Sequence, residues 1–273
     1  MKKKLLLCAL ISVWLAVAYG AKVETLDVDS SCMCKKIKTS VVLPDCYQAG
    51  GQALPVVYLL HGWSGNYQSW VKDFPDTSKL ADLYHVIVVC PDGGYSSWYF
   101  DSPIDKAFQY ETFVAKELVR HIDTTYTTIT NREGRAISGL SMGGHGALYL
   151  AFKHQDIFGA AASMSGGVDI RPFPTSWNLS ERLGDYATHP QNWETNSVIN
   201  LVPLLKPHSL AIQFDCGTSD FFYGVNKKLH EELLSRNIPH DYTEREGAHN
   251  LDYWRNSLPY HMLFFHRYFT NGK

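Results

Sequence analysis

The sequence predicts an α/β fold: a mostly parallel central sheet with helices on both faces, preceded by antiparallel strands near the N-terminus. Two observations support this fold. After about residue 50, short apolar runs alternate with longer segments of helical character, an order that is typical of parallel sheets. The runs are apolar at nearly every position, as expected for strands that are covered on both faces. Functional residues of such sheets gather in loops at the carboxyl ends of the strands.

Five runs are expected to form the buried core strands, at residues 56–60, 86–90, 135–138, 160–164 and 210–215, and a further short strand is expected at 241–245. Two earlier segments are expected to pair antiparallel at the sheet edge, at 23–28 and 35–43. Helical character is found at residues 69–84, 106–126, 142–154, 225–237 and 253–269. Pro259 is expected to kink or break the last helix, because proline lacks a backbone N–H. Residues 166–207 have no strong period and are expected to form a long insertion that covers the site.

The composition limits the classes of function. With 273 residues, of which 45% are hydrophobic, the chain can form one large α/β domain with a sizeable core. The formal net charge of -2 provides no basic field for nucleic acid or for an anionic membrane. Neither is therefore expected as a partner. No cofactor and no metal are expected for the chemistry that the motifs below indicate.

The first twenty residues have the pattern of a cleavable signal peptide. Lys2, Lys3 and Lys4 form a basic start, an apolar run extends from residue 5 to 17, and Ala18-Tyr19-Gly20 places small residues before the cleavage position. A buried N-terminal helix or a single membrane anchor is the alternative, but the apolar run is short for a membrane span. We therefore expect a signal peptide at 1–20, a single α/β domain at 21–273, and export to the periplasm or the medium without a stable membrane anchor.

Five cysteines follow this leader. Cys90 and Cys216 close apolar runs and are expected to be buried thiols. Cys32, Cys34 and Cys46 lie close together, and after export Cys34–Cys46 or Cys32–Cys46 could oxidise to a disulfide, which the sequence leaves open. A zinc site would need a fourth ligand that this segment does not supply.

The segment Gly139-Leu140-Ser141-Met142-Gly143 matches the G-x-S-x-G nucleophile elbow. A serine hydroxyl is a poor nucleophile until a base takes its proton and a sharp turn exposes its oxygen. The required context is present, because an apolar strand precedes the motif and small residues open the helix after it. Ser141 is therefore the expected nucleophile.

The base is expected late in the chain, because folds with this elbow place Ser, then Asp or Glu, then His in that order. Among 12 histidines, His249 is the best placed, in a loop after the last short strand and before the final helix. His240 and His261 are also late, but one precedes a strand and the other lies in a helix. His61 follows the first core strand and is interpreted as a residue that braces its loop.

The acid that orients the histidine is expected to be Asp220, in the loop Cys216-Gly217-Thr218-Ser219-Asp220. Asp215 is the alternative, but it ends the preceding strand and is expected to serve the structure. Two backbone N–H groups must also bind the oxyanion of the tetrahedral intermediate. Met142, directly after the nucleophile, and Trp63, in the loop after the first core strand, are expected to donate them.

These segments resemble the bacterial Putative esterase family of α/β-hydrolases, which includes tributyrin, feruloyl and acetyl-xylan esterases, S-formylglutathione hydrolase and mycolyltransferases. The matching segments spread from about residue 25 to 270 and are Tyr58-Leu59-Leu60-His61-Gly62, Ser97-Trp98-Tyr99-Phe100-Asp101, Gly139-Leu140-Ser141-Met142-Gly143-Gly144, Cys216-Gly217-Thr218-Ser219-Asp220, Gly247-Ala248-His249 and Tyr253-Trp254. The resemblance implies an α/β-hydrolase fold with Ser141 as nucleophile, Asp220 as acid and His249 as base. The leader argues against S-formylglutathione hydrolase, which works on a cytosolic thiol metabolite.

The expected function is therefore an exported serine carboxylesterase for short-chain acyl (acetyl) or feruloyl esters. The expected substrates are small-molecule or polysaccharide-linked esters. Trp98 and Trp177 are expected to wall the substrate pocket, with ordinary packing of the insertion as an equal alternative. An acyltransferase that uses the same triad and an inactive carbohydrate-binding homologue are the competing functions. The sequence leaves the oligomeric state open.

Overall fold

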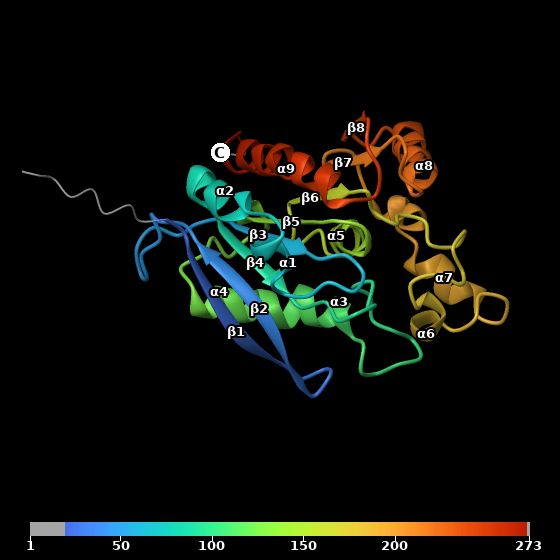
Figure 1. Ribbon diagram of the computed structural model, residues 1–273, viewed down its shortest axis with the longest axis horizontal. Coiled ribbons are helices and arrows are strands. Elements are labelled where there is room, and N and C mark those ends of the chain that lie inside the picture. The colour runs from blue at the N-terminus through green and yellow to red at the C-terminus, as the bar shows by residue number, and fades with distance from the viewer. Residues whose placement is uncertain (1–19, 272–273) are drawn as a thin grey trace, which may run out of the picture.

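One eight-stranded sheet organises residues 20–271, the part of the chain that the computed structural model describes (Figure 1). Its order is β1-β2-β4-β3-β5-β6-β7-β8. The strands are β1 Lys22–Ser30, β2 Lys35–Leu43, β3 Val56–Leu60, β4 Ile87–Pro91, β5 Arg135–Gly139, β6 Ala160–Met164, β7 Ala211–Gly217 and β8 Asp241–Arg245. The pairs β1–β2 and β2–β4 are antiparallel, and all pairs from β4 to β8 are parallel. The expected fold class is confirmed.

Helices cover both faces of this sheet (Figure 1). The α-helices are α1 Ser69–Lys72, α2 Asp76–Tyr84, α3 Tyr110–Thr112, α4 Val119–Thr125, α5 Met142–Lys153, α6 Leu179–Leu183, α7 Pro190–Asn196, α8 Tyr223–Ser235 and α9 Leu251–Asn271. A π-helical turn and two 3-10 turns complete them, at Phe113–Leu118, Arg132–Gly134 and Val198–Leu204. Helices α2 and α9 contact each other on one face, and α5 packs on the other.

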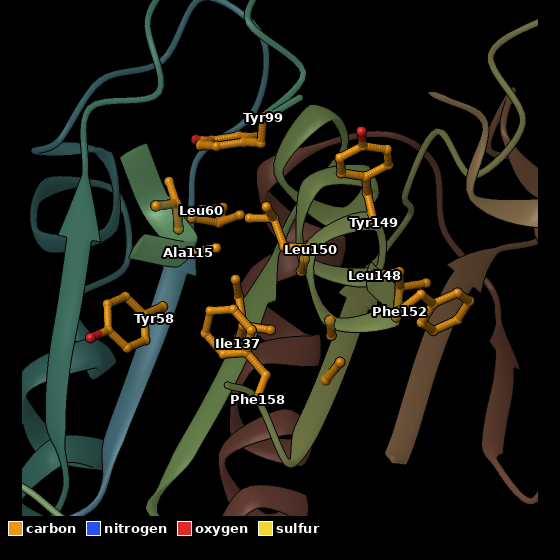
Figure 2. Close-up of a cluster of buried hydrophobic side chains, with 14 of the residues drawn as sticks. Tyr58, Leu60, Tyr99, Ala115, Ile137, Leu148, Tyr149, Leu150, Phe152 and Phe158 are labelled. Carbon is orange, nitrogen blue, oxygen red and sulfur yellow. The ribbon is translucent and has the colours of Figure 1, made fainter. Parts of the chain in front are cut away.

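The two faces of β3 enter two separate apolar clusters, because successive side chains of a strand point in opposite directions. Tyr58 and Leu60 face the α5 side, where Figure 2 shows them near Ile137 of β5 and the apolar residues of α5. Val57 and Leu59 face the α9 side. All five side chains of β3 are buried, which explains why the strand is apolar at every position. Each large apolar side chain stabilises the fold by about 1.5–3 kcal/mol.

Three helical segments differ from the expected ones. Helix α9 runs from Leu251 to Asn271 through Pro259, so the expected break does not occur. The hydrogen bond lost at proline is offset by the burial of Leu258 and Met262 on the same helix. The segment 69–84 instead divides before α2, whose N-cap is Pro75. The segment 106–126 becomes helical only at α3 and contains the π-helical turn.

The insertion of residues 166–207 contains α6, α7 and a 3-10 turn, and it lies to one side of the sheet (Figure 1). The five cysteines of the described residues are free thiols, with Cys90 and Cys216 buried and Cys34 and Cys46 exposed. Apart from Gly20, the predicted signal peptide lies outside the described residues. Within residues 20–271, no helix combines the length and the hydropathy that a membrane span requires.

Candidate active site

Ser141 occupies a sharp turn between β5 and α5. Its backbone has φ 55° and ψ -117°, a conformation that residues with a side chain rarely adopt. The turn is fixed by the Ser141 N–H, which donates to the Met164 carbonyl at 3.0 Å. A Cβ at Gly143 would collide with the Leu60 carbonyl, and one at Gly139 would collide with the backbone of Gly143. Both glycines of the elbow are therefore needed for the close approach of helix and strand.

Ser141, His249 and Asp220 form a continuous hydrogen-bonded chain. Ser141 Oγ is 2.8 Å from His249 Nε2, and His249 Nδ1 is 2.8 Å from Asp220 Oδ2. A carboxylate only accepts, so Nδ1 carries the proton and donates to Asp220, while Nε2 accepts from the serine hydroxyl. The Asp220 side chain is fully buried and that of His249 is 14% exposed. The hydrogen-bonded side chains therefore extend from the interior of the protein, at Asp220, to a solvent-accessible pocket.

The loops after β7 and β8 deliver the acid and the histidine. Asp220 lies beyond a turn at Gly217, and its Oδ1 accepts the Phe222 N–H at 2.8 Å. His249 lies between β8 and α9. A Cβ at Gly217 would collide with the Gly247 carbonyl, so the two loops pack directly against each other. This contact keeps Asp220 within reach of His249.

Asp215, the alternative acid, is paired with a different histidine. Its Oδ2 is 2.7 Å from His261 Nε2, and its Oδ1 accepts from the Ser257 hydroxyl at 2.9 Å. The side chains of Asp215 and His261 are fully buried. The structure therefore brings Asp220, and not Asp215, to His249.

The loop after β3 lies beside the elbow. A Cβ at Gly62 would be 3.5 Å from Ser141 Cβ, so the backbone of this loop passes close to the serine. Trp63 is the next residue of the loop. Met142 is the first residue of α5, where N–H groups have no acceptor in a preceding turn. The N–H groups of Trp63 and Met142 thus remain the candidate donors for an oxyanion.

His61 braces the same loop, as the sequence analysis interpreted it. Its Nδ1–H donates to the Gly62 carbonyl at 2.8 Å, and its Nε2 accepts the Gly93 N–H at 2.7 Å. Burial lowers the pKa of His61, which agrees with the neutral ring that these two bonds require. Both ring nitrogens are engaged, so His61 is not available as a second base.

A pocket of about 360 Å³ opens beside Ser141. Aromatic side chains line part of it, namely Trp63, Phe74, Trp177, Phe221 and Trp254, and polar side chains line another part, namely Ser64, Ser69 and Asp73. Trp177 and Phe221 are stacked with ring centroids 5.4 Å apart. The Phe221 ring is in turn 4.2 Å from the His249 ring. The aromatic wall therefore extends to the candidate base.

Of the two tryptophans expected in the pocket wall, the structure places only Trp177 there. Trp98 is 1% exposed, and its indole N–H donates to the Trp177 carbonyl at 3.3 Å. Trp98 thus supports the wall from behind instead of forming it. The reason is that the loop of Trp98 packs on α5, where the Trp98 ring lies edge-on to His145 at 5.4 Å.

Two aromatic residues of the wall were missed by the sequence analysis although a signal existed. Phe221 directly follows Asp220, and Trp254 lies five residues after His249. Both flank residues already assigned to the site, and both rings contact the His249 ring, with centroids 4.2 and 4.8 Å away. Aromatic neighbours of an expected triad were therefore the available signal.

Asn178 was also missed, and no sequence signal marks it. Its Oδ1 accepts the Trp63 indole N–H at 3.1 Å, which joins the insertion to the loop after β3. Asn178 and Trp177 both have positive φ, of 58° and 50°, so the backbone at this contact is strained. The hydrogen bond between Asn178 and Trp63 holds the neighbouring Trp177 over the pocket. Tertiary packing brings its two partners together, so the sequence does not reveal it.

The elbow, the hydrogen-bonded chain and the parallel sheet together define an α/β-hydrolase with the geometry of a serine hydrolase. Within residues 20–271, no three His, Cys, Asp or Glu side chains cluster as metal ligands would. A profile of the family described as Putative esterase matches residues 30–265. The chain belongs to this family.

Three curated relatives illustrate the range of the family. An esterase of Mycobacterium tuberculosis is 31% identical over 236 residues, which are 77% of this chain and 52% of the relative. The chain thus spans about half the length of that relative. An acetyl esterase of Caldicellulosiruptor saccharolyticus is 30% identical over 75% of this chain and 80% of its own. A diacylglycerol acyltransferase/mycolyltransferase of Mycobacterium leprae is 37% identical over 88% and 82%.

Among solved structures, a ferulic acid esterase is similar over 92% of this chain and 99% of its own, with 28% identity and a TM-score of 0.78. The likeness therefore extends over most of the chain. It supports the α/β-hydrolase fold over the described part of the chain.

Proposed function

We propose that this protein is an exported serine carboxylesterase that hydrolyses short-chain acyl (acetyl) or feruloyl esters carried on carbohydrate. The observation that carries the proposal is the chain of two 2.8 Å hydrogen bonds from Ser141 through His249 to Asp220 beside an open pocket. Family membership supports the esterase chemistry. The acetyl esterase and the ferulic acid esterase among the similar proteins support the two acyl classes.

The geometry allows hydrolysis in two acyl-transfer steps. His249 Nε2 takes the Ser141 proton while Oγ attacks the ester carbonyl carbon, and the charge that develops on the carbonyl oxygen is met by the N–H groups of Trp63 and Met142. The tetrahedral intermediate collapses, the bond to the alcohol oxygen breaks, and the alcohol leaves with the proton from His249. Water then repeats the attack on the acyl-enzyme and releases the acid. Asp220 stabilises the imidazolium in both steps.

The lining of the pocket suits an aromatic acyl group and a polar alcohol. Trp177, Phe221 and Trp254 provide flat apolar surfaces, against which a planar phenyl-propenoyl group could stack. Ser64 and Ser69 provide hydroxyl groups in another part of the pocket, and hydroxyl groups can hydrogen-bond to a sugar. An acetyl group would leave much of the aromatic surface unused, so a feruloyl ester is the preferred substrate in this proposal.

Export is the second half of the proposal and rests on the leader of residues 1–20, with its basic start, short apolar run and small residues before Ala21. An exported enzyme meets external esters, such as acylated polysaccharides, instead of cytosolic thioesters. The slightly negative net charge of the chain is compatible with export.

An acyltransferase is the second candidate function, and the similarity to a mycolyltransferase favours it. The two functions share the acyl-enzyme and differ in whether water or an added alcohol removes the acyl group. Turnover of p-nitrophenyl acetate with increasing glucose or glycerol separates them. An esterase forms mainly acetate at every alcohol concentration, whereas a transferase forms mainly the new ester.

Labelling with a fluorophosphonate tests the proposed chemistry. We expect one equivalent to react with the wild type and none with Ser141→Ala, while circular dichroism shows both proteins folded. A folded wild type that stays unlabelled would contradict the proposed serine hydrolase activity. The remaining hypothesis would then be an inactive carbohydrate-binding homologue. A panel of p-nitrophenyl acetate, butyrate and octanoate, methyl ferulate and acetylated xylan then identifies the acyl group.

A further inference from the structure

Behind the candidate site lies a second array of a serine, a histidine and an aspartate. Ser138 Oγ is 2.9 Å from His261 Nδ1, and His261 Nε2 is 2.7 Å from Asp215 Oδ2. All three residues have an exposed fraction of 0%, so no substrate can reach Ser138. Burying a carboxylate and an imidazole costs free energy unless each polar atom is paired. The array therefore needs an explanation other than catalysis.

The remaining oxygen of the buried carboxylate is also paired. Asp215 Oδ1 accepts from the Ser257 hydroxyl at 2.9 Å, and Arg245 Nη2 lies 3.4 Å from the same oxygen. Arg245 also donates to Ser257 Oγ. We refer to Ser138, Asp215, Arg245, Ser257 and His261 as the buried network; four of them are buried, and Arg245 at its edge is partly exposed. Its hydrogen bonds are continuous from β5 to β8.

The buried network joins strands that do not touch. Strand β6 separates β5 from β7 in the sheet, so no backbone hydrogen bond fixes their distance directly. His261, from α9, bonds to Ser138 on β5 and to Asp215 on β7, and so spans β6. Along the chain, Ser138 precedes Ser141 by three residues, and Asp215 precedes Asp220 by five. The same imidazole thus ties the elements that carry the nucleophile and the acid.

The other members of the buried network flank the histidine of the site. Arg245 ends β8, four residues before His249. Ser257 and His261 belong to α9, which begins two residues after His249 at Leu251. The loop of His249 is therefore anchored at both ends by side chains of the network. Each residue of the Ser141–His249–Asp220 chain lies just beyond an element that the network holds.

We propose that the buried network consists of positioning residues, which set the separation of Ser141, His249 and Asp220 by tying β5, β7, β8 and α9 together. The inference rests on the proposed function, because only an acyl-transfer reaction depends on that separation. A catalytic arrangement of side chains must be held within about half an ångström of its productive geometry. A misplacement of about 1 Å can cost about 100-fold in rate. Loss of the network should therefore lower turnover more than substrate binding.

Three variants of the network test this inference with p-nitrophenyl acetate and with a fluorophosphonate. His261→Phe removes both hydrogen bonds and keeps a ring, and we expect kcat to fall about 10- to 100-fold with KM changed less than about twofold. The rate of Ser141 labelling should fall in parallel. His261→Gln retains a donor for Asp215, and Ser138→Ala cuts only the link to β5. Both should retain more activity than His261→Phe.

A matched control lies at the other end of the same strand. Arg135, at the start of β5, forms a buried ion pair with Asp123 at 2.6 Å. Asp123→Asn should lower the free energy of unfolding but leave kcat and the labelling rate within about twofold, because this pair lies far from the elbow. All variants are compared well below the melting temperature of the least stable one.

Each outcome decides the inference. If folded His261→Phe keeps kcat and the labelling rate, or if Asp123→Asn lowers them as much, the network is only structural and the inference is wrong. If His261→Phe does not fold, Ser138→Ala gives the decision, because it removes a single hydroxyl. A wild type that neither labels nor turns over any ester overturns the proposed function, and the inference with it.

Discussion

Asp215 and Asp220 are five residues apart, yet their carboxylates bond to different histidines. Asp215 lies within β7 and points into the layer between the sheet and α9, where His261, Ser257 and Arg245 surround it. Asp220 lies beyond the turn that ends β7. The strand fixes the direction of the first side chain, and the turn frees the second to face the pocket.

Substitution of the two aspartates should separate their roles. In Asp220→Asn the amide oxygen keeps the Phe222 N–H, so the amide NH2 faces His249 Nδ1 and favours the wrong imidazole tautomer. We expect kcat to fall about 10⁴-fold with little change in KM. Asp215→Asn leaves the hydrogen bonds between Ser141, His249 and Asp220 in place. It should lower kcat by about 10-fold, because it loosens the buried network. Steady-state kinetics with p-nitrophenyl acetate measure both. A larger loss in Asp215→Asn would reverse the assignment of the acid.

Trp177 offers a test of the substrate at the same scale. Its ring lines the pocket and stacks on Phe221, and an aromatic pair of this kind contributes about 0.5–1.5 kcal/mol. We expect Trp177→Ala to lower kcat/KM for methyl ferulate about 2- to 10-fold, with a smaller effect on p-nitrophenyl acetate. Equal losses on both substrates would mean that Trp177 does not contact the acyl group.

At the scale of elements, the strands were the most predictable part of the fold. Strands such as β3 and β4 are buried on both faces, so their sequences are apolar throughout, and that pattern is visible without a structure. The elbow was predictable for a related reason, because the collisions at Gly139 and Gly143 leave glycine as the residue that fits. Local steric limits and burial restrict which residue types fit at these positions, and this restriction can be recognised in the sequence.

The insertion and the final helix were less predictable, because longer-range contacts decide them. Helix α9 passes through Pro259 since its apolar face is held against the sheet. The position of Trp177 depends on the bond between Asn178 and Trp63, which are 115 residues apart. Trp98 was expected in the pocket for its residue type, but packing against His145 places it behind the wall. Such contacts leave no periodic pattern.

Glu111 of α3 joins this helix to α5 through charged hydrogen bonds and should give the fold an acid-sensitive step. Its carboxylate is 2.6 Å from Lys153 Nζ, 2.9 Å from His154 Nε2 and 2.8 Å from Tyr149 OH. Burial acts to raise the pKa of Glu111, but the hydrogen bonds of His154 and Lys153 outweigh it and lower the pKa from 4.5 to about 2.

Because the folded pKa of Glu111 is the lower one, its contribution is present above pH 4.5 and is lost as the pH falls toward 2. The expected loss is about 2–3 kcal/mol of the free energy of unfolding. Urea unfolding at a series of pH values measures it. In Glu111→Gln the acid dependence should be shallower, and an unchanged slope would show that other carboxylates dominate.

For the whole molecule, the described chain begins beside the helix α2 (Figure 1). The Ala21 N–H donates to the Asp82 carboxylate at 3.0 Å. If the leader is removed before Ala21, as the proposed function expects, the new ammonium group forms at this carboxylate. A neutral hydrogen bond then becomes a charged one, which is stronger.

If the protein is exported as proposed, we expect the mature chain to begin at Ala21, which intact-mass measurement checks. Asp82→Asn should lower the free energy of unfolding by about 1 kcal/mol in a protein that starts at Ala21. The loss should be smaller when Gly-Ser precedes Ala21, because the amide there carries no charge. Equal losses in the two forms, or a mature chain with another first residue, would contradict the cleavage position.

The two serine–histidine–aspartate arrays have a practical consequence for chemical proteomics. Trypsin cuts after Arg135 and Lys153, so Ser138 and Ser141 fall in the same peptide of residues 136–153. A mass shift of that peptide cannot distinguish the pocket serine from the buried one, and fragment ions between the two positions are required. In the native protein the adduct should be found only on the serine whose oxygen solvent can reach. Ser138 and Ser141 each bond to a histidine that bonds to an aspartate. Comparing the labelling of the two serines therefore measures the effect of solvent accessibility within one peptide.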